Sequence, residues 1–201
     1  MMDNSFYAQR KSIRKYKSTE VKDDDLIAML DAARVAPSAK NRQPWRFVVV
    51  RGAEKEKLLE VMAKGVAAMY HKPFMPKRFR NGLASAENTM RIMGEAPVII
   101  LVFNKNSNDP FKSKSYGKRV SEIHDTMSIG AAIQNMLLCA ASRGLGTLWI
   151  GNTVYAHKEI TKLYNTKEQL AAAVAVGFPD EEPEGRPKFS LDEIVQGIDI
   201  K

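Results

Sequence analysis

Cysteine is nearly absent from this sequence, since Cys139 is the only one among 201 residues. One cysteine excludes a disulfide within the chain and fits a reducing compartment, so we expect the protein to be cytoplasmic. No apolar run reaches the roughly 18 residues that cross a bilayer. Residues 1–11 also lack the hydrophobic segment of a secretory signal. We therefore expect no association with a membrane.

The motifs that usually supply catalytic groups are missing as well. The sequence has no Gly-x-Ser-x-Gly elbow and no triad, and the glycines at 144 and 146 lack the spacing of a dinucleotide-binding turn. The three histidines, at positions 71, 124 and 157, do not have the spacing of zinc ligands, so no metal is expected. Cys139 lies within an expected helix and is interpreted as part of the core. The sequence therefore offers no evident protein nucleophile.

Positive charge is in excess, with a formal net charge of +8. Such a charge suits either nucleic acid or an anionic phosphate cofactor or dinucleotide substrate. The basic residues are spread along the chain and are not interleaved with aromatic residues, as a stacking platform for nucleic acid requires. Charge alone therefore does not indicate nucleic-acid binding, and no nucleic-acid partner is expected.

The length of the chain suits one domain over residues 1–201 with one substantial core. Strands are expected at residues 45–50, 96–104, 146–150 and 170–178, and the wholly apolar run 96–104 predicts a central strand buried on both faces. Helices are expected to begin near Ser5 and near Val21, the second ending at Pro37, with others at 54–70, 121–143 and 156–165. Gly144 is typical of the residue that follows a helix.

Three segments are expected to lie outside these elements. Residues 72–82 contain two prolines and are predicted to be irregular, either as a lid over a substrate, as a contact with a partner subunit, or as a plain surface loop. Residues 105–119 are predicted to form a long exposed loop that is a candidate to cover a site. Residues 192–200 are expected to seek the edge of a sheet, either that of this chain or that of a partner.

Two basic motifs near the chain ends are candidates for binding an anion. Arg10, Ser12 and Arg14 alternate, so an extended segment would turn them to one side as a clamp for an oxyanion. The other interpretation is a solvated basic turn. Near the other end, Arg186 and Lys188 suit an anion or a charged surface turn.

The loop between the second helix and the first strand is the third candidate. It contains Ser38, Ala39, Asn41 and Gln43, whose hydroxyl, amides and backbone N–H groups suit a polar, planar ligand. The same residue types are ordinary in turns, so both interpretations stand when the loop is considered by itself.

Taken together, four motifs in register resemble the flavin-dependent nitroreductase family over almost the whole chain. They are Arg-x-Ser-x-Arg at 10–14, Ala-Pro-Ser-Ala-Lys-Asn-Arg-Gln-Pro-Trp-Arg-Phe at 36–47, the segment 130–151 from Gly-Ala-Ala-x-Gln-Asn to Trp-Ile-Gly, and Gly-Phe-Pro at 177–179 with Arg-x-Lys at 186–188. The resemblance implies an α+β, three-layer sandwich whose mixed, mainly antiparallel sheet is flanked by helices. It further implies FMN bound in a homodimer, with each site built from both subunits.

The resemblance also implies roles for particular residues. Arg10, Ser12, Arg186 and Lys188 would hold the phosphate and ribityl chain, and Arg14 would lie near the pyrimidine edge, where a cation stabilises the reduced flavin. Ser38 and Asn41 would contact the ring from the second subunit, and Gly151 would offer its N–H towards N5, with Ile150 against the ring. Gln134 is either a flavin contact or part of the dimer core. The full set implied to bind the cofactor is Arg10, Lys11, Ser12, Arg14, Pro37, Ser38, Ala39, Asn41, Gln134, Ile150, Gly151, Arg186 and Lys188.

The activity that the resemblance implies is hydride transfer from NADH or NADPH, through FMN, to a small-molecule acceptor such as a nitroaromatic or a quinone in a ping-pong cycle. Two alternatives accompany it. Reductive dehalogenation or flavin fragmentation would keep FMN on the same scaffold, whereas a basic nucleic-acid-binding module would need no flavin at all.

Overall fold

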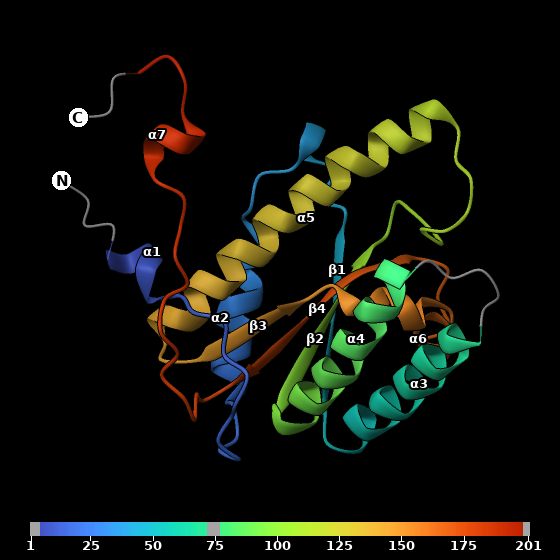
Figure 1. Ribbon diagram of the computed structural model, residues 1–201, viewed down its shortest axis with the longest axis horizontal. Coiled ribbons are helices and arrows are strands. Elements are labelled where there is room, and N and C mark those ends of the chain that lie inside the picture. Colours follow the sequence, from blue (N-terminus) through green and yellow to red (C-terminus); the bar gives the residue numbers. More distant parts are fainter. Residues whose placement is uncertain (1–4, 72–76, 199–201) are drawn as a thin grey trace.

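The computed structural model describes residues 5–71 and 77–198, which form a four-stranded sheet between two layers of helices (Figure 1). In chain order the elements are α1 (Ser5–Gln9), α2 (Asp23–Arg34), η1 (Ala39–Asn41), β1 (Trp45–Arg51), α3 (Ala53–Tyr70), α4 (Lys77–Glu95), β2 (Val98–Asn104), α5 (Tyr116–Ser142), β3 (Gly146–Ile150), η2 (Asn152–Ala156), α6 (His157–Leu163), β4 (Gln169–Gly177) and α7 (Leu191–Ile194).

The strands follow the order β1-β2-β4-β3, and every neighbouring pair is antiparallel. The sheet is therefore antiparallel rather than mixed, and a single isolated parallel bridge, between Ser12 and Thr147, brings the N-terminal segment to its edge. Strand β2 is buried at all seven positions, which confirms the prediction of a central strand covered on both faces.

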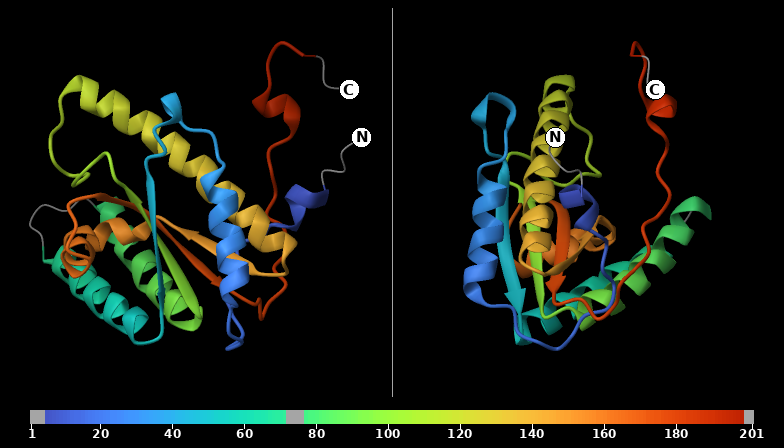
Figure 2. Two further views of the ribbon diagram at one scale, coloured as in Figure 1. Left: turned by 180° about the vertical axis from the view of Figure 1, so that it is seen from behind. Right: turned by 90° about the vertical axis from the view of Figure 1, so that its left-hand side faces the viewer.

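Alternate residues of β2 face opposite helical layers. Ile100 and Val102 belong to the core beneath α2 and α5, whereas Ile99, Leu101 and Phe103 belong to the core beneath α3 and α4. Because side chains alternate along a strand, a fully apolar strand can complete two cores at once. The two views in Figure 2 show the same division into three layers. The predicted three-layer α+β sandwich is thus confirmed.

Helix α4 corrects one prediction. Residues 72–82 were expected to be irregular, but α4 begins at Lys77 and continues to Glu95. Both prolines of this segment precede Lys77 in the sequence, so neither removes a hydrogen bond from the helix interior. The buried residues Leu83, Ala86 and Ile92 recur at helical spacing, a signal that extends over a stretch for which no element was predicted. Residues 72–76 of the expected lid lie outside the described part of the chain.

The chain after β4 corrects another prediction. Residues 192–200 were expected to approach a sheet edge of this chain or of a partner, and the first alternative is wrong for the described part, because Leu191–Ile194 form the short helix α7 and residues 195–198 join no strand. The local reason is a capping box, because Ser190 and Glu193 satisfy each other's backbone N–H groups at the start of the helix. Residues 199 and 200 lie outside the described chain.

The remaining differences concern the ends of elements. The exposed loop predicted for residues 105–119 ends at Ser115, because α5 starts at Tyr116, five residues before the expected beginning. Gly144 follows α5 with φ of +73°, as predicted for a residue that ends a helix. Among the described residues, no helix combines the length and the apolar character that crossing a membrane would require.

Candidate functional site

The two basic motifs meet because the N-terminal segment runs between β3 and the chain that follows β4. Ile13 donates its N–H to Thr147 O at 2.9 Å, which ties the segment to β3. Lys17 N donates to Phe178 O at 2.9 Å, and Asp180 N donates back to Lys15 O at 3.0 Å. These backbone bonds join residues more than 130 positions apart, so the fold itself brings the ends of the chain together.

Two glycines allow this close approach. A Cβ at Gly146 would lie 2.7 Å from Ile13 Cγ1, and one at Gly177 would lie 2.9 Å from Tyr16 Cδ1. Tyr16 itself is buried, and its hydroxyl donates to Ile13 O at 2.8 Å. Burial raises the pKa of Tyr16 above its usual range, so this hydroxyl keeps its proton and its hydrogen bond. The segment that carries Ser12 and Arg14 is therefore held by packing as well as by backbone bonds.

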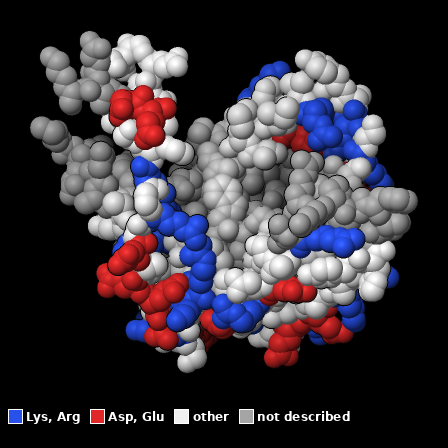
Figure 3. Space-filling model, viewed as in Figure 1, with Lys and Arg blue, Asp and Glu red and all other residues white. Residues whose placement is uncertain are grey.

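Cations from both ends of the chain line one cavity of about 360 Å³. Arg10, Lys11 and Arg14 come from the N-terminal segment, and Arg186 and Lys188 come from the tail. Ser12 adds a hydroxyl, and Glu184 is the one carboxylate in the lining. Figure 3 shows the corresponding run of Lys and Arg along the segment after β4, with acidic residues beside it. Guanidinium, ammonium and hydroxyl donors around a hollow fit a phosphate group.

Arg14 is held by two contacts within this region. Its backbone N–H donates to Glu181 Oε1 at 2.5 Å, and one guanidinium nitrogen donates to Ser12 O at 3.1 Å. Glu181 was assigned no role in the sequence analysis. A carboxylate a few residues after a strand is only a weak sequence signal of a binding role. The contact between Glu181 and Arg14 becomes visible only in the folded chain.

The loop expected to recognise a planar ligand has a strained backbone. Lys40, Asn41 and Gln43 have φ of 53°, 53° and 45°, in the left-handed region that costs energy for residues other than glycine. Ser38 Oγ accepts the N–H of Gln43 at 3.0 Å, and the N–H of Ala39 donates to Ser128 Oγ at 3.2 Å. Such strain is typical of loops whose conformation serves a ligand or a partner.

This loop and the cationic cavity lie at different places along α5. Ala39 bonds to Ser128 of that helix, whereas Arg10 and Lys11 border a hollow that also contains Ala141. Thirteen residues of helix separate Ser128 from Ala141, which corresponds to roughly 20 Å. Pro37, Ser38, Ala39 and Asn41 are therefore not part of the cavity that holds the basic motifs of the same chain.

The other expected contacts form a third group. Gln134 is half-buried on α5, Ile150 is buried at the end of β3, and Gly151 follows it at the surface. A Cβ at Gly151 would meet no described atom within 4 Å, so the space beside it is open. Trp149 is 45% exposed, and its ring lies 3.7 Å from the position of a Cβ on Gly130 of α5. None of these residues lines the cavity of the basic motifs.

The described residues contain no group of three or more His, Cys, Asp or Glu side chains that could hold a metal ion. Cys139 is half-buried against the core beneath α5, where burial raises the pKa of its thiol and disfavours the reactive thiolate. The site as described can therefore bind and orient an anionic molecule, but the chemistry of a nucleophile or a metal has no visible source in it.

With this geometry established, comparison with known proteins defines the class. The sequence profile of the Nitroreductase family matches residues 7–178, so the chain belongs to the nitroreductase family. A Methanothermobacter thermautotrophicus protein assigned as an NADH dehydrogenase/NAD(P)H nitroreductase is 32% identical over 192 residues, which cover 92% of this chain and 81% of the relative. The iodotyrosine deiodinase of Thermotoga neapolitana is 31% identical over 194 residues, which cover 93% of this chain and 92% of that protein.

A solved structure supports the same assignment. A protein assigned as a nitroreductase from Desulfovibrio desulfuricans, crystallised in complex with FMN, is 28% identical and superimposes with a TM-score of 0.68. The alignment covers 98% of this chain and 96% of the other. The resemblance inferred from the four motifs is confirmed by both kinds of comparison.

Proposed function

We propose that this protein is an FMN-dependent oxidoreductase that transfers a hydride from NADH or NADPH to a nitroaromatic, a quinone or a similar acceptor in a ping-pong cycle. The observation that carries the proposal is the cavity in which five cations from the two chain ends gather around Ser12. Membership of the nitroreductase family and the 28% identical FMN complex support it.

The residues of the cavity fit the phosphate end of FMN. Arg10, Ser12, Arg186 and Lys188 would bind the phosphate and the ribityl chain. With Arg14 and Lys11, the cavity presents six donor side chains. Bound FMN supplies the two-electron chemistry, because it accepts a hydride from the nicotinamide and returns one to the acceptor. The protein contributes binding, orientation and electrostatics.

Arg14 is the residue we assign to stabilising reduced flavin. Its backbone is held by Glu181, and its guanidinium is held by Ser12 O, so its charge is fixed before the cofactor binds. A preorganised cation beside the pyrimidine edge favours negative charge there, which makes reduction easier. The effect requires no motion of the side chain during turnover.

We also propose that the working unit is a homodimer in which the partner completes each site. The loop residues expected to contact the ring, such as Ser38 and Asn41, are separated from the cationic cavity by about half the length of α5. A second copy would supply them. Its binding would also cover apolar surface, because Leu191 and Ile194 of α7 are 59% and 63% exposed and Met127 of α5 is 61% exposed.

Sedimentation analysis tests the dimer. The double variant Leu191→Glu/Ile194→Glu should shift the protein towards the monomer and reduce its flavin content together. Leu163→Glu is the matched control, because Leu163 is 39% exposed on α6, in the opposite helical layer. A dimer that survives the double variant with full flavin would refute the role given to α7.

The absorbance spectrum of purified protein tests the cofactor. We expect flavin bands from yellow protein, bleaching on anaerobic addition of NADH or NADPH, and recovery on addition of a nitroaromatic or a quinone. Protein that is free of flavin and does not take up added FMN would refute the assignment. Fractionation of the source cells tests the proposed cytoplasmic location.

A second activity is favoured by one particular relative, the 31% identical iodotyrosine deiodinase. Reductive dehalogenation on the same FMN scaffold would give iodide release from an iodotyrosine without turnover of nitroaromatics or quinones, and fragmentation of flavin would instead consume the cofactor. A panel containing all three acceptor types, followed by analysis of the flavin after turnover, distinguishes these activities. The outcome also defines the acceptor class of the main proposal.

A further inference from the structure

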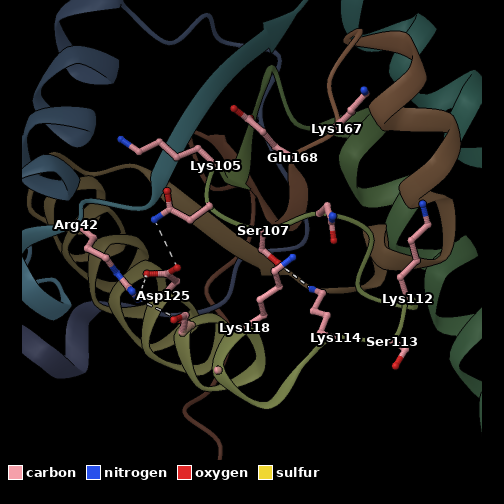
Figure 4. A pocket seen from close by; sticks show the side chains of 14 residues that line it. Arg42, Lys105, Ser107, Lys112, Ser113, Lys114, Lys118, Asp125, Lys167 and Glu168 are labelled. Carbon is pink, nitrogen blue, oxygen red and sulfur yellow. Dashed lines mark hydrogen bonds and ion pairs between the residues drawn. The ribbon is translucent and has the colours of Figure 1, made fainter.

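A second hollow lies far from the basic motifs, between the loop at residues 105–115 and the beginning of α5 (Figure 4). Its volume of about 800 Å³ is in the range of ligand pockets. Arg42 and Lys105 lie on one side of it, Lys112 and Lys167 on the other, and Lys118 lies between them. The space-filling view shows the same concentration of positive charge over this end of α5 (Figure 3).

The carboxylates of this cavity are already neutralised. Asp125 is paired with Arg42 at 2.6 Å, and Glu168 is paired with Arg46 at 2.5 Å. By contrast, none of the lysines at positions 105, 112, 118 and 167 forms an ion pair within the described part of the chain. Four unpaired cations around one hollow repel each other unless an anion enters it.

A smaller hollow of about 460 Å³ lies beside the first and shares Asn108, Lys112 and Lys167 with it. Its lining adds Lys158 and Lys162 of α6, which also form no ion pair among the described residues. It also contains one carboxylate, Asp109, whose Oδ1 accepts the N–H of Phe111 at 2.9 Å. The two hollows therefore make one basic cleft with two lobes, and Lys112 and Lys167 stand where the lobes join.

His157, in the smaller lobe, is a buried polar group without a protein partner. Its side chain lines the lobe, the residue is only 4% exposed, and Nδ1 has no hydrogen-bond partner among the described atoms. Burial lowers the pKa of this imidazole, so it is neutral at physiological pH. A buried nitrogen of this kind is normally satisfied, and a ligand in the lobe would satisfy it.

The walls of the larger lobe are held rigidly. Lys114 and Glu122 form an ion pair whose side chains are 6% and 7% exposed, and Ser107 Oγ donates to Glu122 Oε1 at 3.1 Å. The N–H of Gln169 donates to Ser107 O at 2.9 Å, and the N–H of Lys105 donates to Pro44 O at 2.9 Å. These bonds fix the loop before any ligand arrives, which reduces the entropy cost of binding.

The residue types in the lining also indicate that the ligand carries no aromatic ring system. No residue of the larger lobe is aromatic or aliphatic, and the smaller lobe contains no Phe, Tyr or Trp. A nucleobase or flavin ring would find no Phe, Tyr or Trp side chain in the lining on which to stack. Lysine recognises phosphate as a point charge, and a row of lysines spread over two lobes suits several linked phosphates.

We propose that this cleft binds a chain of linked phosphates, recognised by Lys105, Lys112, Lys118, Lys167, Lys158 and Lys162. The site is separate from the cationic cavity proposed for FMN in the same chain. Ser121 lines the cleft, whereas Ala141 lies near Arg10, and twenty residues of α5 between them correspond to roughly 30 Å. The inference does not depend on the proposed oxidoreductase activity.

Titration calorimetry with inorganic tripolyphosphate tests the proposal on the full-length protein, with whatever flavin it carries. We expect one site per chain, weakened by added salt, and weaker binding of inorganic phosphate. Lys112→Gln/Lys167→Gln should lose about tenfold in affinity for each lysine, because each removes one charged hydrogen bond. The matched control, Lys22→Gln/Lys57→Gln, removes the same charge from an exposed position directly before α2 and an exposed position of α3, and should bind normally.

Equal losses in both double variants would overturn the proposal, because binding would then follow net charge alone. Competition of tripolyphosphate with NADPH during turnover would also overturn it as a separate site, since the lysines would then belong to coenzyme binding. ATP separates the sources of the phosphate chain. Affinity equal to that of tripolyphosphate supports recognition of phosphates alone, and much tighter binding of ATP would contradict a cleft without a base platform.

Discussion

The close contact between Gly146 and Ile13 offers the sharpest test of how this protein builds its cofactor site. The substitution Gly146→Ala places a Cβ 2.7 Å from Ile13 Cγ1, 2.9 Å from Ile13 Cβ and 3.0 Å from Ile13 Cγ2. Ordinary contacts between carbon atoms are about 3.5 to 4.0 Å. The N-terminal segment must therefore move away from β3, against the bond from Ile13 N to Thr147 O.

We expect this displacement to destabilise the protein and to weaken FMN binding. Overpacking of a tight core position costs about 1–3 kcal/mol in the free energy of unfolding. Ser12 and Arg14 move with Ile13, while Arg186 and Lys188 stay on the tail, so the donors no longer converge. Losing one charged hydrogen bond to the phosphate costs about 1.5 kcal/mol, which is roughly a tenfold rise in the FMN Kd.

Urea unfolding and fluorescence titration of FMN measure the two effects. Gly94→Ala, in α4, is the matched control, because its Cβ would lie 3.7 Å from Leu59 Cδ1 of α3, an ordinary contact distance. This control should be stabilised by about 0.5–1 kcal/mol and should bind FMN normally. In an Ile13→Ala background, which removes two of the three clashing atoms, the loss from Gly146→Ala should shrink. Stability and FMN affinity that match those of the Gly94 variant would refute the reasoning.

Three further predictions concern charge. Arg186→Ala/Lys188→Ala should raise the FMN Kd roughly 100-fold, because two charged hydrogen bonds are lost, whereas the control Lys57→Ala should leave the Kd unchanged. Equilibrium dialysis measures the Kd, and equal FMN affinities of the double variant and the control would contradict the role given to the cavity. Arg42→Leu should cost about 3–5 kcal/mol of unfolding free energy, because the Asp125 side chain is 2% exposed and loses its partner. The control Arg34→Leu breaks an exposed pair with Asp31 and should cost at most about 1 kcal/mol. If chemical denaturation gave similar losses of unfolding free energy for Arg42→Leu and Arg34→Leu, burial of the Asp125 carboxylate would not explain the cost. Finally, burial acts to raise the pKa of Glu122, but Lys114 and Arg119 outweigh it and hold the pKa below 4.5. This carboxylate therefore stabilises the fold above pH 4.5, and its contribution is lost as the pH falls through the lowered pKa. The difference in unfolding free energy between the natural protein and Glu122→Gln should therefore disappear in acid.

Local patterns predicted much of the fold because they reflect local physics. The apolar run at residues 96–104 predicted a doubly buried strand, and β2 is buried throughout. Patterns failed where a competing local signal was misjudged. Two prolines suggested an irregular segment, but they precede α4 rather than interrupt it, and the capping box at Ser190 forms a helix where alternation suggested a strand.

For the candidate site too, the sequence predicted some features and only the structure showed the others. The residue types at positions 10–14 and 186–188 indicated donors for an anion, yet nothing in either motif shows that the two meet. Their meeting depends on the register of β3 and β4 and on the room left by Gly146 and Gly177. The distance between Ser38 and the cationic cavity also emerged only from their places along α5.

The sequence by itself determined most of the elements, the buried central strand, the family and the chemical types of the binding groups, because periodicity and residue chemistry are properties of neighbouring positions. Only the tertiary structure decided which of those groups share a cavity, that the loop at residues 37–43 lies apart from the basic motifs, and that unpaired lysines from the 105–115 loop, α5 and α6 line a second cleft. The physical reason is that antiparallel pairing and helix packing set distances between residues that are far apart in the chain, and no local pattern records those distances.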